Sequence, residues 1–171
     1  TRANVGYVHA IAHQFGGKYH TPHGLANAIM LPHVLAFSAP AVTSRLAELA
    51  VRARLGEEGE SDAALADKFL DGVTQLNRDL NIPTYLQALK DADVPALARA
   101  ACHEAHTGYP VLRYMTLAEC EAMIRKVLPL APSKAAKLAK LAKLAKGDVD
   151  SGEVAKAKPA RKRTIKAGDA A

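Results

Sequence analysis

The sequence predicts an all-α protein, and two observations carry that prediction. Apolar residues recur at intervals of three and four along most of the first 128 residues, which is the spacing of one face of a helix. Sustained alternation of apolar and polar residues, Asn-Gly turns and an alternating strand–helix pattern do not occur. The sequence also lacks a glycine-rich dinucleotide fingerprint and a phosphate-binding loop, so we expect no nucleotide-binding fold within it.

Two helices separated by a short break are predicted at the start of the chain. The first covers residues 5–15, and we expect Gly16-Gly17 to end it because glycine is typical of helix C-termini. Thr21 and Pro22 suit the N-cap and the first position of a second helix, which runs to about residue 31. The glycine turn would let the ends of the two helices converge.

Prolines and capping residues divide the rest of the predicted helical region. We expect Pro32 and Pro40 to interrupt the helical structure after the second helix. Ser61 and Thr116 suit helix N-caps, and Thr116 begins a Thr-x-x-Glu capping box. Further helices are expected at residues 42–55, 63–80, 85–90, 94–105 and 117–127.

Length and composition narrow the class of protein. The chain has 171 residues, of which 49% are apolar and 23% charged, as in ordinary globular proteins. No uninterrupted apolar run approaches the roughly 20 residues of a membrane span, and two cysteines are too few for a disulfide scaffold. No secretory h-region follows Thr1, so we expect a cytoplasmic protein that does not engage a membrane. Because the chain does not begin with Met, we also expect it to be the C-terminal part of a longer polypeptide.

The net charge of +6 is unevenly distributed along the chain. Residues 1–132 carry 12 basic and 13 acidic side chains, whereas residues 133–171 carry 11 basic and 4 acidic side chains. The C-terminal segment, residues 132–171, is rich in Ala and Lys and repeats Leu-Ala-Lys every three residues, which predicts a weakly amphipathic helix followed by a disordered basic end. We call this segment the basic tail. It is either a solvated extension, a contact for nucleic acid or another polyanion, or a helix for a partner or membrane surface.

Histidines are concentrated near the start of the chain, at positions 9, 13, 20, 23 and 33. His9 and His13 are one helical turn apart, so their side chains share a face and lie about 6 Å apart. His23 lies at the start of the next predicted helix, where the positive end of the helix dipole favours the neutral ring that a metal requires. From spacing alone, His9 and His23 are either metal ligands or hydrogen-bonded core residues, and His13 is a ligand, an acid–base group or a structural residue.

The remaining histidines are expected to be less important for chemistry. His33 follows Pro32 and is interpreted as a core residue that satisfies hydrogen bonds. His20 is interpreted either as a loop residue or as a residue that hydrogen-bonds to the metal ligands. His103 and His106 lie near a polar helix end and are interpreted as ordinary surface residues.

The residues around the histidines also resemble a known family. Residues 6–17 read GYVHAIAHQFGG and residues 21–28 read TPHGLANA. This combination of paired histidines, Gly-Gly and Pro-His-Gly-x-x-Asn-Ala closely resembles the iron-containing (group III, iron-activated) alcohol dehydrogenases. The similarity continues in LPHV at residues 31–34 and runs more weakly to about residue 128, so it excludes the basic tail.

The resemblance implies a fold and a division of the chain. Residues 1–131 would be the all-helical, metal-binding C-terminal domain of a dehydroquinate synthase-like, iron alcohol dehydrogenase fold, and residues 132–171 the basic tail. In that family an N-terminal α/β domain of the same polypeptide binds NAD or NADP. That domain has no counterpart in this sequence.

The resemblance also implies site residues. His9 and His23 correspond to two of four metal ligands, the other two being an Asp and a His upstream of this sequence. His13 corresponds to the further active-site histidine near the metal and the nicotinamide, so it is both the candidate catalytic residue, as a proton relay, and the candidate cofactor contact. The ion would be Fe(II), with Zn(II) as the alternative.

The implied reaction is the interconversion of small alcohols with aldehydes or ketones, with a divalent ion as Lewis acid and hydride transfer to NAD(P). A dimer or other homo-oligomer is expected by the same resemblance, and the chain without its N-terminal domain is expected to be inactive. The competing function is polyanion binding, above all of nucleic acid, through the basic tail, with an inactive enzyme-derived body.

Overall fold

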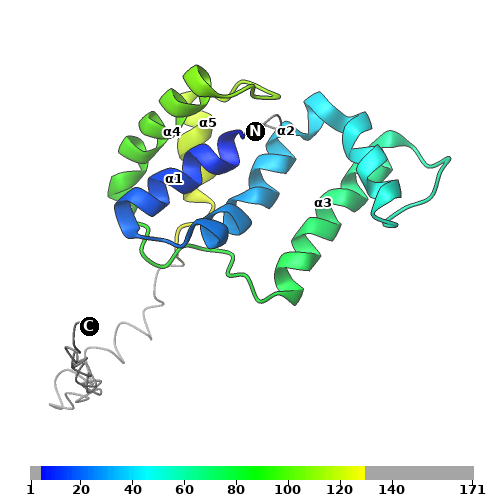
Figure 1. Ribbon diagram of the computed structural model, residues 1–171, viewed down its shortest axis with the longest axis horizontal. Coiled ribbons are helices and arrows are strands. Elements are labelled where there is room, and N and C mark those ends of the chain that lie inside the picture. Colours follow the sequence, from blue (N-terminus) through cyan, green and yellow to red (C-terminus); the bar gives the residue numbers. More distant parts are fainter. Residues whose placement is uncertain (1–4, 130–171) are drawn as a thin grey trace, which may run out of the picture. The chain divides into compact units, whose positions relative to one another are not determined.

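The described part of the computed structural model is residues 5–129, and all regular structure within it is helical. This confirms the predicted all-α class. The elements are α1 (Tyr7–Tyr19), α2 (His23–Arg52), α3 (Asp62–Asp79), the short 3-10 turn η1 (Asp91–Asp93), α4 (Val94–Gly108) and α5 (Leu117–Arg125). Figure 1 shows α1 between α2 and α4, with α3 running alongside α2. The predicted boundary at residue 131 and the basic tail lie outside the described residues.

The break between α1 and α2 differs from the prediction. Helix α1 continues through Gly16-Gly17 to Tyr19, and His20 ends it in the left-handed conformation, with φ 54° and ψ 30°. The His20 N–H donates to the carbonyl oxygen of Gly16 at 2.9 Å, so His20 supplies the reversal that was expected from glycine. Pro22, rather than Thr21, precedes the first residue of α2, and no side chain caps that helix.

Helix α2 continues through Pro32, against the prediction, whereas the predicted interruption at Pro40 is confirmed by a kink two residues later. Pro32 has no N–H to offer the carbonyl oxygen of Ala28 one turn earlier. That oxygen instead accepts a hydrogen bond from the Asn77 side-chain amide of α3 at 2.8 Å, which explains why the helix tolerates Pro32. Two residues after Pro40, α2 kinks at Val42, where φ is −140° and ψ is 27°.

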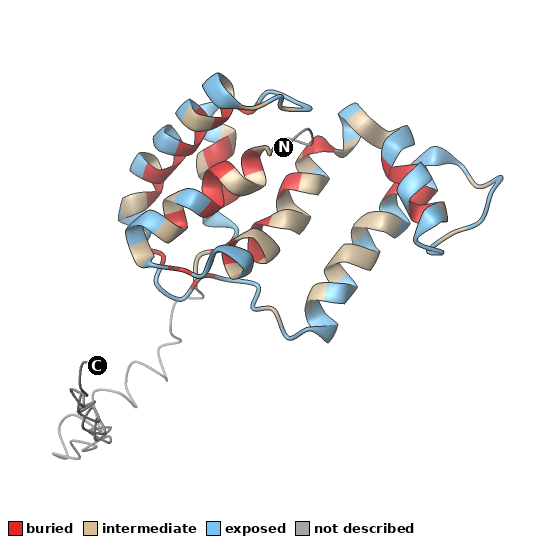
Figure 2. Ribbon diagram, viewed as in Figure 1, coloured by how far each residue is buried: buried red, intermediate tan, exposed pale blue. Residues whose placement is uncertain are grey.

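The core lies where α1, α4, α5 and the first half of α2 meet, as the buried positions in Figure 2 show. Its largest fully buried side chains include Ile11 and Phe15 of α1, Met30 of α2 and Ile124 of α5. A smaller cluster, Ala47, Ala50 and Leu65, joins the second half of α2 to α3. The core therefore fixes α1 and the start of α2, which carry the predicted site histidines.

Two of the predicted helix caps are confirmed, but one predicted helix is wrong. Ser61 caps α3 and Thr116 forms a complete capping box with Glu119. Residues 85–90 are not helical, since the Leu86 N–H donates to the Val127 carbonyl oxygen at 2.8 Å and the buried side chains of Leu86 and Leu89 hold the segment in the core. This tertiary contact overrides the local preference for a helical turn.

Helix α2 is long and apolar enough to cross a membrane by length and hydropathy alone, with a mean hydropathy of 1.5. The sequence analysis considered only uninterrupted apolar runs and therefore did not single out this helix. Ala26, Ile29, Met30 and Val34 of α2 are nevertheless buried in the same core as α1. We therefore interpret α2 as a core helix.

Candidate metal centre

The structure brings His9, His13 and His23 together. Helix α1 presents His9 and His13 on one face, and α2 begins at His23. The ring centre of His23 lies 5.2 Å from that of His9 and 5.3 Å from that of His13, and the His9 and His13 rings are 6.0 Å apart. The three predicted site residues therefore form one cluster where α1 packs against the start of α2.

Asn27 determines how the His23 ring is held. Its side-chain nitrogen lies 2.9 Å from Nε2 of His23 and also donates to the His23 carbonyl oxygen at 3.0 Å. Because that amide nitrogen only donates, Nε2 of His23 accepts and carries a lone pair rather than a proton. This lone pair is engaged with the Asn27 amide, so a metal bound at Nε2 of His23 would replace that hydrogen bond. Asn27 Oδ1 is buried and has no hydrogen-bond partner within residues 5–129, so the polar groups beside His23 are incompletely satisfied.

The surroundings of His9 also favour a neutral ring. Burial is the first cause that lowers the pKa of His9 below its usual 6.5, and the nearby rings of His23 and His13 lower it further, with Glu104 opposing. At neutral pH the His9 ring is therefore uncharged. Two imidazoles on adjacent helices suit a borderline divalent ion such as Fe(II) or Zn(II).

The described residues provide only part of a coordination shell. Between residues 5 and 129, no group of three or more His, Cys, Asp or Glu side chains is arranged to hold a metal ion. His9 and His23 are a pair, and His13 has another partner. The donor chemistry of the pair fits part of the coordination shell of a divalent ion.

That partner of His13 is Glu104 of α4, which the sequence analysis missed. Oε1 of Glu104 lies 2.6 Å from Nδ1 of His13 and also accepts a 2.6 Å hydrogen bond from the Tyr109 hydroxyl. Oε2 accepts from the Gln14 side-chain amide at 2.9 Å. The signal for Glu104 was weak, namely one acidic residue between the buried positions Cys102 and Ala105.

The other histidines lie away from the cluster or are held by other contacts. His20 is the exposed C-cap of α1, and His103 is exposed on α4. His33 is half-buried, and burial, followed by Lys126, lowers its pKa below the usual 6.5; within the described residues its ring makes no hydrogen bond, contrary to the prediction. The His106 ring bonds the hydroxyls of Tyr7 at 2.7 Å and Tyr114 at 2.8 Å, so it connects α1 to the segment before α5.

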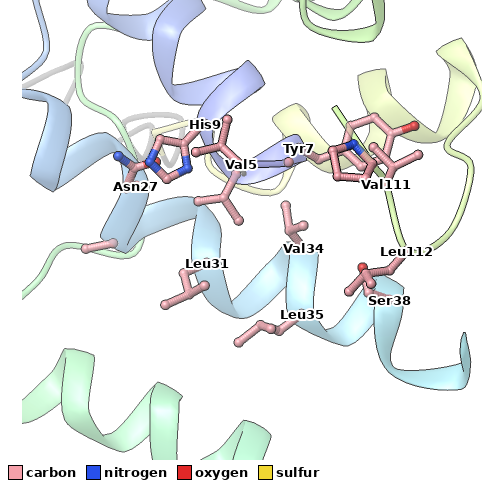
Figure 3. Close-up of a pocket in the computed structure, with 14 residues that line it drawn as sticks. Val5, Tyr7, His9, Asn27, Leu31, Val34, Leu35, Ser38, Val111 and Leu112 are labelled. Carbon is pink, nitrogen blue, oxygen red and sulfur yellow. The ribbon is translucent and has the colours of Figure 1, made fainter. Parts of the chain in front are cut away.

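An apolar cavity of about 500 Å³ lies beside His9 and Asn27. Figure 3 shows Leu31, Val34 and Leu35 of α2 along one side, with Val111 and Leu112 at the far end from His9. The cavity offers a small organic molecule apolar walls next to the histidine cluster.

Comparison with known proteins places this geometry in a family. Residues 1–128 match the family described as "Fe-containing alcohol dehydrogenase family, C-terminal". The chain is 43% identical over 101 residues to the 1,3-propanediol dehydrogenase of Klebsiella pneumoniae, a match that covers 58% of this chain and 26% of that protein. It is 40% identical over 129 residues to alcohol dehydrogenase 4 of Saccharomyces cerevisiae, with 72% of this chain and 32% of that protein covered.

A solved structure shows the same fold. The alcohol dehydrogenase from Oenococcus oeni superposes with a TM-score of 0.66 and 31% sequence identity, over 73% of this chain and 33% of that one. The chain thus spans about a quarter to a third of the length of these relatives. The matched residues include the His9, His13 and His23 cluster, and the chain belongs to the Fe-containing alcohol dehydrogenase family, of which it carries the C-terminal helical domain.

Proposed function

We propose that this chain is the C-terminal part of a metal-dependent alcohol dehydrogenase that interconverts small alcohols with aldehydes or ketones using NAD or NADP. The observation that carries the proposal is the convergence of His9 and His23, whose ring centres are 5.2 Å apart, beside an apolar cavity. Family membership supports the reaction class.

His9 and His23 would hold the divalent ion through their ring nitrogens. Because the described residues contain only this pair, the other ligands are expected from an upstream domain of the same polypeptide. That domain would also bind most of the nucleotide. Its residues would therefore determine whether the enzyme uses NAD or NADP. Fe(II) is the expected ion and Zn(II) the alternative, since imidazole binds both.

When bound, the ion acts as a Lewis acid on the substrate oxygen and the nicotinamide accepts hydride. The chain's own residues have further roles in this proposal. The cavity walls Leu31, Val34 and Leu35 bind the substrate's carbon chain and exclude water. His13, which is exposed beside His23, contacts the nicotinamide region and relays the alcohol proton to solvent. The apolar walls favour short alkyl alcohols over charged substrates.

The proposal extends to the whole protein in two respects. We expect the full-length enzyme to form a homo-oligomer, with a dimer as the simplest case, and to be cytoplasmic. The competing function, nucleic-acid binding through the basic tail, concerns residues outside the described range and finds no support in the comparisons, so we do not pursue it.

The experiment that tests this function is turnover by the purified full-length protein. We expect NAD(P)-linked oxidation of short alcohols, 1,3-propanediol and propan-1-ol among them, that stops on treatment with a chelator and returns on addition of Fe(II) or Zn(II). His13→Ala should lower kcat by about a hundredfold or more while the metal stays bound. His103→Ala, at an exposed histidine of α4, is the matched control and should leave kcat unchanged. Absence of turnover with both nucleotides in the metal-loaded protein would contradict the proposal.

A further inference from the structure

Glu104 and His13 come from distant parts of the chain and meet through a short hydrogen bond. The two residues are 91 positions apart, and Oε1 of Glu104 lies 2.6 Å from Nδ1 of His13. The Glu104 side chain is 27% exposed and the His13 side chain 42% exposed. The core already packs α1 against α4 through apolar residues such as Ala12 and Ala101, so this polar contact is not needed to join the helices.

Three donors surround the Glu104 carboxylate. They are Nδ1 of His13, the Tyr109 hydroxyl and the Gln14 amide, and Gln14 is itself anchored to the Ala10 carbonyl oxygen at 3.1 Å. Burial raises the pKa of Glu104, but the hydrogen bonds from Tyr109, His13 and Gln14 outweigh it and leave that pKa below its usual 4.5. An ionised carboxylate only accepts hydrogen bonds, so the proton between Glu104 and His13 resides on Nδ1.

We propose that Glu104 is a positioning residue that holds the His13 ring in one orientation with its proton on Nδ1 and the lone pair on Nε2. Within residues 5–129, Nε2 of His13 takes no hydrogen bond, so it is available to a substrate or a water molecule. Tyr109 and Gln14 fix the carboxylate in turn. For the neutral ring this tautomer follows from the contacts, whereas its importance for turnover rests on the proposed function.

The arrangement has a chemical consequence for a proton relay. A neutral imidazole whose Nδ1–H is held by a carboxylate presents the other nitrogen as a proton acceptor in a fixed direction. Without Glu104, the ring would be free to rotate and to exchange tautomers, so only a fraction of molecules would present the acceptor. Glu104 would therefore affect kcat more than KM.

The first test reads the tautomer directly. Full-length protein is labelled with ¹⁵N-histidine and loaded with Zn²⁺, which is diamagnetic, and the His13 ring nitrogens are assigned by comparison with His13→Ala. We expect the wild type to carry its proton on Nδ1 and Glu104→Ala to show a mixture of tautomers. Glu121→Ala removes a glutamate of α5 that pairs with Arg125, and it should leave the His13 signals unchanged. An unchanged Nδ1–H tautomer in Glu104→Ala would overturn the proposal.

The second test asks whether Glu104 acts through His13. We expect Glu104→Ala to lower kcat about tenfold to a hundredfold, the usual effect of removing a supporting hydrogen-bond partner, with little change in KM. Added to His13→Ala, the same substitution should cause no further loss. Glu104→Gln keeps an acceptor and Tyr109→Phe removes one donor, so both should lie between wild type and Glu104→Ala, and both guard against a folding defect in the alanine variant.

The two proposals can fail separately. Equal losses of kcat from Glu104→Ala in the presence and absence of His13 would overturn the positioning role. Full-length protein without any alcohol turnover would refute the proposed function, while the ¹⁵N measurement would still decide the contact between Glu104 and His13.

Discussion

His9, His13 and His23 are identical side chains whose surroundings give them different chemical states. Burial and neighbouring rings keep His9 neutral, the Asn27 amide donates to Nε2 of His23, and the Glu104 carboxylate accepts from Nδ1 of His13. Two rings are thus suited to bind a metal and the third to accept a proton. The division follows from neighbours on α2 and α4, so it is not readable from the spacing of the histidines.

Asn77 is a single residue on which a long helix depends. Its amide replaces the backbone donor that Pro32 removes from the Ala28 carbonyl oxygen. We predict that Asn77→Ala lowers the free energy of unfolding by about 1–3 kcal/mol, because the buried carbonyl loses its partner. Urea denaturation followed by circular dichroism measures the change. The exposed Gln75→Ala on the same helix is the control, and a loss no larger than that of the control would refute the role of Asn77.

The capping interaction between Glu119 and Thr116 should stabilise the fold in a pH-dependent way. Hydrogen bonds from the backbone N–H and then the hydroxyl of Thr116 hold the pKa of Glu119 below its usual 4.5, with burial opposing and Arg113 assisting. A carboxyl with a lower pKa in the folded state stabilises the fold above its unfolded pKa and loses that contribution as the pH falls through the folded value. We therefore expect Glu119→Gln to lower Tm near neutral pH and to converge with the wild type in acid, as the pH falls through the lowered pKa of Glu119 in the folded state. A constant Tm difference from neutral to acid pH would contradict this assignment.

The elements differ in how far local sequence determines them. Ser61 and Thr116 cap α3 and α5 as predicted because a cap depends on neighbouring residues alone. Residues 85–90 could not be predicted, since the Val127 carbonyl that holds them is about forty positions away. The same applies to the site: the histidines lie in one contiguous motif and were identified, whereas Glu104 reaches His13 only through the packing of α4 on α1.

A substitution at Gly17 tests whether α1 continues past the Gly-Gly pair. It is exposed and helical, and a Cβ added there would meet no atom within 4 Å. We predict that Gly17→Ala raises the free energy of unfolding by about 0.5–1 kcal/mol, because alanine loses less backbone entropy in a helix. If Gly-Gly ended the helix, as the sequence pattern indicated, the substitution would be neutral or destabilising. Urea denaturation of Gly17→Ala, with His20→Val at the true left-handed position as a destabilising control, separates the two cases.

At the scale of the whole molecule, we propose that the chain carries one part of a two-part site. It holds a pair of converging histidines and an apolar cavity, and it spans about a quarter to a third of its relatives' length. The helical fold and the histidine motif followed from the sequence because both are local patterns. The remaining ligands and the nucleotide site did not, because in this account they belong to a domain outside the chain.

The measurement that tests this account most directly is the metal content of the full-length protein by elemental analysis, with His9→Ala and His23→Ala beside the wild type. We predict a stoichiometric divalent ion in the wild type and its loss from both variants, because each removes one of the imidazoles that converge beside the cavity. His103→Ala, at an exposed histidine of α4, should retain the ion. Wild-type metal content in both His9→Ala and His23→Ala would contradict the central claim that these two residues hold the metal.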